Sequence, residues 1–220
     1  MSKALIFGST GLTGSALLEL LLRNDQYSEL VCFVRKESSS AHNKLRYIKT
    51  DFSDLDKHAN EFEKTDVYCC LGTTIKKVNY DKEKFKEADL YTPLKIAECV
   101  KKYHANQFLI ISALGANSKS RIFYNRVKGE LQEKLLSLHI SSLHIFQPSL
   151  LLGDRKEKRI GEEIGAVFSK LISPLLTGRS KKYRPIKVTA IAKAMAKVAG
   201  ENKQGEYIYT SDLIQKMADA

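Results

Sequence analysis

The chain lacks several features that would assign it at once to a class of protein. None of its apolar runs approaches the roughly 20 residues that span a bilayer. The start Met1-Ser2-Lys3 enters a strand directly, without a signal-peptide pattern. We therefore expect no membrane span and a cytoplasmic location. The five histidines form no ligand-spaced pair, so we expect no metal site.

Cysteine is scarce and carries no motif. The four cysteines, at positions 32, 69, 70 and 99, lack metal-ligand spacing, and the neighbours Cys69 and Cys70 would point to opposite faces of a strand. We therefore interpret them as reduced, structural residues.

Acidic residues are in the minority, which leaves a formal net charge of +11. Such a charge attracts anions and could support weak binding to nucleic acid or acidic membranes. The lysines are scattered, however, and no recognised nucleic-acid motif accompanies them. A solvated basic surface is the better interpretation, and no dedicated nucleic-acid module is expected.

A glycine-rich run is the most informative feature that is present. It lies between an apolar strand over Ala4 to Phe7 and an apolar helix over Leu12 to Arg23. Glycines at this point let the backbone turn tightly and approach a pyrophosphate, while N–H groups at the helix start face the phosphates. The pattern predicts a dinucleotide-binding loop made of Gly8, Ser9, Thr10, Gly11, Leu12, Thr13 and Gly14.

The residues after the second strand indicate which dinucleotide is bound. Arg35 and Lys36 stand where an enzyme specific for the non-phosphorylated cofactor would carry Asp or Glu. A guanidinium can hold a 2′-phosphate with paired hydrogen bonds and stack on adenine. NADP(H) is therefore the expected cofactor, with a solvated basic strand end as the alternative.

Alternating strands and helices predict an α/β fold. Further strand-like runs occur at 45–49, 66–71, 107–112 and 142–147, mostly separated by amphipathic helices. This order is typical of a Rossmann-type, doubly wound, mostly parallel sheet, and 220 residues suit a single domain. Pro93 should break the helical stretch from Lys82 to Tyr103 near Tyr91. After Pro148 the alternation weakens, and residues 149–188, with an apolar helix over Ile164 to Leu176, are expected to form a small substrate lid.

Residues just past the strands are candidates for the site, because ligands bind outside the carboxyl ends of parallel strands. The Asp51 carboxylate could accept a hydrogen bond from the adenine amino group, and Phe52 could offer the adenine an apolar wall; the alternative is that Asp51 is an ordinary surface residue. At the end of the fourth strand, a glycine permits close approach and hydroxyls could reach the cofactor; a plain turn is the alternative. These residues are Leu71, Gly72, Thr73 and Thr74.

Three residues form the predicted catalytic group. Ser112 ends the fifth strand, and Tyr124 and Lys128 stand four apart on a helix, so they share a face. The ammonium of Lys128 favours the phenolate form of Tyr124, so Tyr124 is suited to act as a general acid or base. Lys128 can also hold the hydroxyls of the nicotinamide ribose. Ser112 would hydrogen-bond the carbonyl or alcohol of a small-molecule substrate. The alternative is that these residues are only a half-buried tyrosine beside a surface lysine, without a catalytic role.

Together these stretches resemble the short-chain dehydrogenase/reductase superfamily in its extended and atypical form, across nearly the whole chain. Cys69 to Thr74, Tyr124 to Glu130 and Pro148 to Arg155 resemble, more narrowly, the Tat-interacting-protein-like oxidoreductases. The resemblance implies a Rossmann fold, NADPH binding and a Ser-Tyr-Lys site, in a group described as regulators as often as enzymes. Many superfamily members carry a relay asparagine before the fifth strand. None occurs from Asp81 to Tyr103, and Asp89 and Thr92 are the two candidates for its place.

Two function classes follow. The first is an NADPH-dependent oxidoreductase in which Tyr124 exchanges the proton. The second is an NADPH-binding regulatory protein that acts through a protein partner. A nucleotide-sugar epimerase is less favoured, since only about 70 residues follow Pro148. Homodimers are common in the superfamily, but no exposed apolar stripe in this sequence decides the oligomeric state. The pair Asp154-Arg155 fits substrate binding and a structural salt bridge equally.

Overall fold

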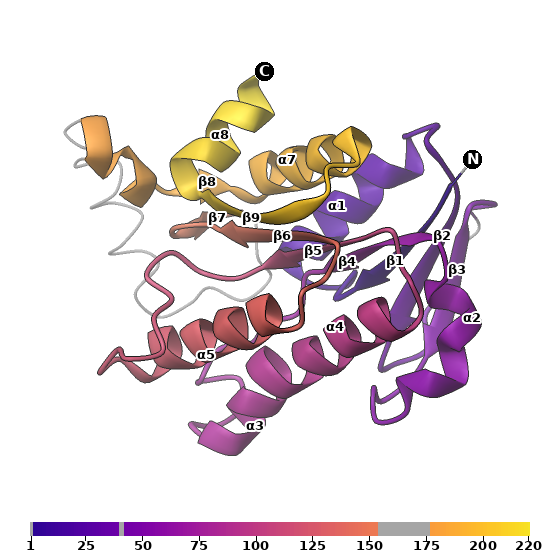
Figure 1. Ribbon diagram of the computed structural model, residues 1–220, viewed down its shortest axis with the longest axis horizontal. Coiled ribbons are helices and arrows are strands. Elements are labelled where there is room, and N and C mark those ends of the chain that lie inside the picture. Colours follow the sequence, from indigo (N-terminus) through magenta and orange to yellow (C-terminus); the bar gives the residue numbers. More distant parts are fainter. Residues whose placement is uncertain (1, 40–41, 154–176) are drawn as a thin grey trace.

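Seven parallel strands form the centre of the computed structural model, which describes residues 2–39, 42–153 and 177–220. The strand order is β3-β2-β1-β4-β5-β6-β9, and every neighbouring pair is parallel (Figure 1). The strands are β1 (Ser2–Phe7), β2 (Tyr27–Val34), β3 (Leu45–Lys49), β4 (Thr65–Cys69), β5 (Gln107–Ile111), β6 (Ser142–Gln147) and β9 (Gly205–Thr210). The chain reverses its direction of travel across the sheet between β1 and β4, so a ligand crevice is expected at their carboxyl ends.

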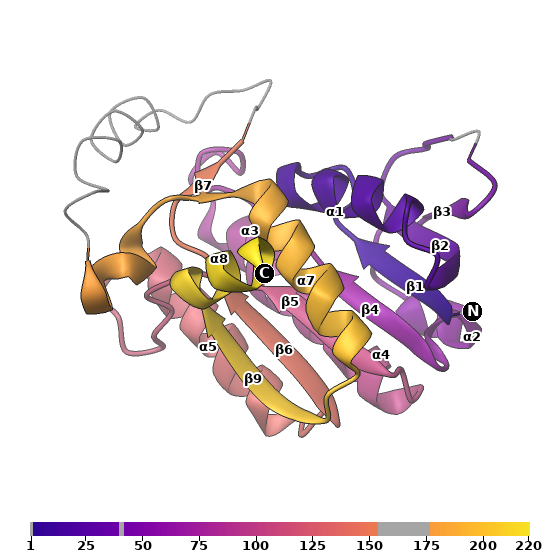
Figure 2. The ribbon, with the colours of Figure 1, turned by 90° about the horizontal axis from the view of Figure 1, so that it is seen from above.

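Helices cover both faces of this sheet, as Figures 1 and 2 show. One face carries α1 (Leu12–Leu22), α7 (Val188–Glu201) and α8 (Ser211–Asp219). The other face carries α2 (Ala59–Phe62), α3 (Lys82–Lys86), α4 (Thr92–Lys102) and α5 (Phe123–Ser137). The Rossmann-type, doubly wound sheet expected from the alternating sequence pattern is therefore confirmed.

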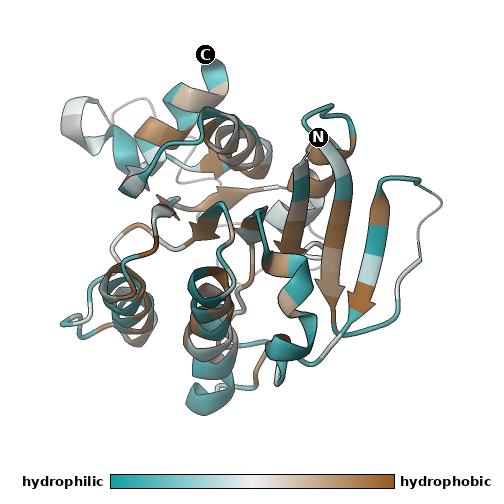
Figure 3. Cartoon of the chain, turned by 45° about the vertical axis from the view of Figure 1, so that its right-hand side comes forward, coloured by the Kyte–Doolittle hydropathy of each residue, from teal (hydrophilic) through white to brown (hydrophobic). Residues whose placement is uncertain are grey.

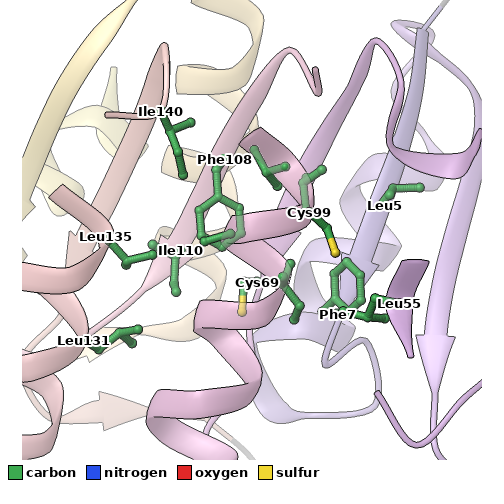
Figure 4. Packing of buried hydrophobic residues seen from close by; sticks show 14 of the residues in the cluster. Leu5, Phe7, Leu55, Cys69, Cys99, Phe108, Ile110, Leu131, Leu135 and Ile140 are labelled. Atoms are coloured by element: carbon green, nitrogen blue, oxygen red, sulfur yellow. The ribbon is translucent and has the colours of Figure 1, made fainter. Parts of the chain in front are cut away.

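Burial on both faces explains the composition of the strands. Parallel strands covered by helices on each side read as continuous apolar runs rather than alternating ones, and Ala4 to Phe7 are all buried. Figure 4 shows the core beneath α5, where Leu131 and Leu135 pack toward Phe108 and Ile110 of β5. In Figure 3 the strands are mainly brown, whereas the helices carry both brown and teal residues, as amphipathic helices do.

The predicted break near Pro93 takes the form of a π-helical turn. Glu87–Tyr91 is π-helical and separates α3 from α4, and Pro93 lies in the first turn of α4. Proline is tolerated there because the first N–H groups of a helix need no intrahelical acceptor. The π turn buries Asp89 and Leu90. The π-helical turn therefore places a carboxylate among the buried residues of this amphipathic helical segment.

Part of the predicted lid lies outside the described residues, namely the helix over Ile164 to Leu176 and the pair Asp154-Arg155. Of the remainder, β7 (Leu151–Leu152) pairs in parallel with β8 (Ile186–Lys187). A 3-10 turn covers Gly178–Tyr183, and α7 begins at Val188, directly after β8. Over the residues described, no helix has the length and apolar character to span a membrane.

Protonation of buried His144 is expected to destabilise the fold in acid. Its Nε2 lies 3.1 Å from the Ser142 hydroxyl and its Nδ1 lies 3.0 Å from the Tyr209 hydroxyl. Burial lowers the pKa of His144 from 6.5 to about 4. The unfolded chain therefore takes up the proton first. The stabilisation is complete above pH 6.5 and is lost as the pH falls toward 4, in total about 3 kcal/mol.

Urea denaturation at about pH 7.5 and about pH 4.5 would test this expectation. A His144→Gln variant, which keeps hydrogen-bonding groups but does not titrate, should lose about 2–3 kcal/mol less between the two pH values than the wild type. His139→Gln is the matched control, because the His139 side chain is largely exposed. An equal loss in the wild type and His144→Gln would contradict the assignment.

Candidate functional site

The loop between β1 and α1 requires glycine at two positions. Gly8 has φ +86°, and a Cβ on it would lie 2.8 Å from the backbone of Cys70. A Cβ on Gly14 would lie 2.0 Å from the carbonyl oxygen of Gly8. The Cys70 N–H also donates to the carbonyl of Phe7 at 2.8 Å. Gly8 and Gly14 therefore let β1, α1 and the end of β4 meet at backbone distance.

The start of α1 is shaped to receive an anion. Gly11 occupies the N-cap, and no described side chain hydrogen-bonds to the helix N-terminus there. The first N–H groups of a helix have no intrahelical partner, and the helix dipole adds positive charge at this end. A Cβ on Gly11 would lie 3.2 Å from the Gly8 carbonyl oxygen, so this position too suits glycine. The residues present therefore fit the pyrophosphate of a dinucleotide.

A cleft of about 590 Å³ opens beside this loop, at the carboxyl ends of β1, β4 and β5. It brings together predicted residues from three distant parts of the sequence. The cofactor loop contributes Gly11, Leu12 and Thr13, the end of β4 contributes Leu71, Gly72 and Thr73, and the catalytic group contributes Ser112, Tyr124 and Lys128.

The other predicted cofactor residues lie outside this lining. Gly8, Ser9 and Gly14 belong to the loop that backs the cleft, with Ser9 buried and Thr10 exposed. Arg35, Lys36 and Asp51 are exposed beyond the ends of β2 and β3, and Thr74 is half-buried. Phe52 is buried, with φ +67° and its ring 6.1 Å from that of Phe7. Phe52 could contact adenine only through the small exposed part of its side chain, because the rest packs in the core.

Lys128 is buried and paired. It is 3% exposed, and its Nζ lies 2.8 Å from Oδ1 of Asp89, which is 1% exposed. The second oxygen of Asp89 accepts the backbone N–H of Thr73 at 2.7 Å. Asp89 thus connects the predicted catalytic lysine to the loop after β4. It is one of the two residues, with Thr92, that stand in the segment where the family resemblance places a relay asparagine.

The charges of neighbouring groups keep Lys128 protonated. Burial alone lowers the pKa of Lys128, but the charges of Asp89 and Tyr124 raise it by more, so the net shift is upward. Tyr124 itself is 40% exposed, and its ring lies 6.0 Å from that of Phe85. The predicted i, i+4 pair is therefore present in one cleft, with a paired ammonium behind an accessible phenol.

Sequence reasoning missed Gln132, which orients Ser112. The Gln132 Nε2 donates to the Ser112 Oγ, and the Gln132 Oε1 accepts from Nε2 of Gln147 at 2.9 Å. With this amide orientation, Ser112 accepts one hydrogen bond and keeps its own hydrogen for another acceptor. Gln132 stands eight residues after Tyr124 on the same face of α5, a spacing that was readable from the sequence.

The chain is similar in sequence to a known family and to individual proteins. Residues 8–141 match a family model described as NAD(P)H-binding. Protein HTATIP2 of Rattus norvegicus is 35% identical over 167 residues, which cover 74% of this chain and 68% of that protein. The protein of Emericella nidulans named "fmp52, mitochondrial" is 27% identical over 232 residues, covering 98% of each chain.

Solved structures show the same fold at low identity. The Bordetella bronchiseptica enzyme WbmH, in complex with NAD+, superposes with a TM-score of 0.70 and is 14% identical, with 100% of this chain and 80% of that chain covered. MoeE5, in complex with UDP-glucose and NAD, has a TM-score of 0.69 at 12% identity and covers 99% of this chain and 81% of its own. At such identities the likeness shows the fold alone.

The expected cytoplasmic location is corrected by these relatives. The similar proteins of Lodderomyces elongisporus, Emericella nidulans, Eremothecium gossypii and Candida albicans are all named mitochondrial. The expectation was wrong because it rested on two absences, of a secretory signal and of an apolar span. Neither absence distinguishes the cytosol from an organelle.

Proposed function

Because this chain belongs to the NAD(P)H-binding family, among the atypical short-chain dehydrogenases/reductases, we propose that it is an NADP(H)-dependent oxidoreductase acting on a small carbonyl or alcohol substrate. One observation carries the proposal: Ser112, Tyr124 and Lys128 line the same cleft as the glycine loop. A polar catalytic group beside a dinucleotide loop is what hydride transfer with proton exchange requires.

Each part of the cofactor has candidate binding residues in this chain. The start of α1 would hold the pyrophosphate, and Gly72 and Thr73 would approach the nicotinamide half. Arg35 and Lys36, exposed past β2, would hold the 2′-phosphate. When bound, the nicotinamide supplies or accepts the hydride.

The protein's own groups would handle the proton. In carbonyl reduction, Tyr124 gives its phenolic proton to the substrate oxygen as the carbonyl carbon gains the hydride, and bulk water later reprotonates the phenolate. Ser112, held by Gln132, donates a hydrogen bond to the same oxygen. Lys128 stabilises the phenolate that Tyr124 becomes. Alcohol oxidation reverses each step.

The substrate would lie beside Ser149, Leu150, Leu151 and Tyr183, the described residues of the region 149–188 that line the cleft. Leu12 and Leu114 line it as well. These leucines form an apolar part of the wall, which favours a carbonyl attached to an apolar group.

A regulatory protein is the second candidate, favoured by the ion pair at Lys128. Asp89 compensates the lysine charge and so reduces what Lys128 offers to Tyr124. In that case the cleft would bind NADP(H), and occupancy would alter contacts with a protein partner, with little turnover.

Calorimetric titration with NADPH and NADH tests the proposed cofactor. The wild type should bind NADPH more tightly, and Arg35→Asp should weaken NADPH binding by roughly 10- to 100-fold, because it removes a charge-assisted contact and adds repulsion. Arg23→Asp, at an exposed position after α1, is the matched control and should change neither affinity. Equal affinities of the wild type for both cofactors would contradict the NADP(H) assignment, and binding of neither would contradict the oxidoreductase.

A further inference from the structure

A second cavity, of about 600 Å³, lies at the amino ends of the strands. It is therefore at the opposite end of the sheet from the cofactor cleft, which lies at the carboxyl ends. The residues that line it are all polar or glycine, and none of them is positively charged: Ser2, Gln26, Asp66, Asn106, Gly200 and Asn202. Five of the six thus offer side-chain oxygen atoms, one of them a carboxylate.

Asp66 is the buried charge of this cavity. It is 2% exposed, and its Oδ2 accepts the Tyr27 hydroxyl at 2.6 Å. Its other oxygen, Oδ1, has no hydrogen-bond partner among the described residues. Burial raises the pKa of the Asp66 carboxyl, and the hydrogen bond from the Tyr27 hydroxyl opposes that shift. A buried carboxylate oxygen without a donor is costly.

Gln107 has a second buried acceptor oxygen that lacks a hydrogen-bond partner among the described residues. It pairs with Asp66 in the register of β4 and β5, so the two side chains leave the same face of the sheet. Its Nε2 donates to the Ala199 carbonyl at 2.9 Å, while its buried Oε1 has no partner within the described part of the chain. Exchanging the two ends of the amide would set Oε1 against the Ala199 carbonyl, so Oε1 must face elsewhere as an acceptor.

We propose that this cavity binds a small monovalent cation, an alkali ion or a primary ammonium group, through Asp66 and the neutral oxygens around it. One carboxylate is balanced by one positive charge. Within the described residues there is no group of three or more His, Cys, Asp or Glu side chains able to hold a metal, as a divalent site of several carboxylates would need. An oxygen-only lining suits hard cations.

Two lysines that follow lining residues in sequence are paired with glutamates. Lys3 and Lys203 follow Ser2 and Asn202. Lys3 pairs with Glu61 at 3.0 Å, and Lys203 pairs with Glu201 at 2.7 Å. Among the described residues, neither of these lysines neutralises the Asp66 carboxylate.

Thermal unfolding in four chloride salts at equal ionic strength and about pH 8 tests the proposal. The salts are those of potassium, sodium, methylammonium and tetramethylammonium; the last cation has no N–H donor and is too bulky to approach a buried oxygen. At about ten times its Kd, a cation that binds the native state should raise Tm by roughly 3–6 °C over tetramethylammonium. A rise with potassium or sodium identifies an alkali ion, and a rise with methylammonium identifies an ammonium group; either supports the site.

Asp66→Asn is the decisive variant. It should abolish the salt-specific rise and, in tetramethylammonium, unfold at or above the wild-type Tm, because its new amide nitrogen can donate to Gln107. Asp54→Asn, at an exposed position, should keep the wild-type response. Crystals of the wild type soaked in rubidium chloride should show an anomalous peak at Asp66. Equal Tm in all four salts, or a rise that survives Asp66→Asn, would overturn the proposal, as would absence of that peak after an alkali-specific rise.

Discussion

An Asp89→Asn substitution is expected to lower the free energy of unfolding by about 3–5 kcal/mol, among the largest effects of any single change in this chain. The substitution keeps an oxygen that can accept the Thr73 N–H, so that contact survives. What it removes is the charge that faces Lys128 at 2.8 Å in a place with almost no solvent. An unpaired ammonium is then left buried, and the cost is its desolvation.

Urea denaturation of three variants separates this explanation from a simple packing defect. Asp89→Asn combined with Lys128→Met should recover much of the lost stability, since no charge is then buried alone. Asp56→Asn removes one partner of the solvent-exposed pair with Lys102 and should be indistinguishable from the wild type. An Asp89→Asn protein as stable as Asp56→Asn would show that the buried pair contributes nothing.

Replacing Tyr124 with phenylalanine is expected to reduce kcat by roughly 10²- to 10⁴-fold, the usual contribution of a general acid or base. Tyr124 is 40% exposed and lies beside Lys128, and it is the proposed acid/base for the substrate. The ring would keep its contact with Phe85, so Tm and the Kd for NADPH should stay close to their wild-type values.

The assay follows NADPH absorbance with a panel of aliphatic and aromatic aldehydes and ketones. Tyr91→Phe is the matched control, because Tyr91 is similarly exposed on the neighbouring π-helical turn and does not line the described cleft. Wild-type turnover by Tyr124→Phe would remove the tyrosine from the mechanism. A wild type that binds NADPH but reduces no member of the panel would favour the regulatory candidate.

Much of the fold could be predicted because its signals are local. The bounds of β3 and β6 agree with the apolar runs at 45–49 and 142–147. The glycine loop was equally readable, since Gly8 and Gly14 meet backbone that only a residue without a Cβ can approach. In both cases a few neighbouring residues contain the physical reason for the structure.

The partners in the site could not be predicted in the same way. Asp89 was considered as a stand-in for a relay asparagine, but its ion pair with Lys128 depends on a π-helical turn that only the packed helix reveals. Gln132 shares the face of Tyr124 and Lys128, yet its hydrogen bond to Ser112 joins α5 to the end of β5. Such contacts depend on how two elements dock, and docking is set by the whole core.

The sequence by itself therefore determined the parallel sheet, the loop that suits a dinucleotide and the identity of the catalytic candidates, because periodicity, glycine placement and helical spacing act over short distances. The tertiary structure alone decided the charge balance. It buried Lys128 against Asp89 at one end of the sheet, and by strand register it set Asp66 beside Gln107 at the other. Burial makes those pairings matter, and burial is a property of the assembled layers rather than of any one segment.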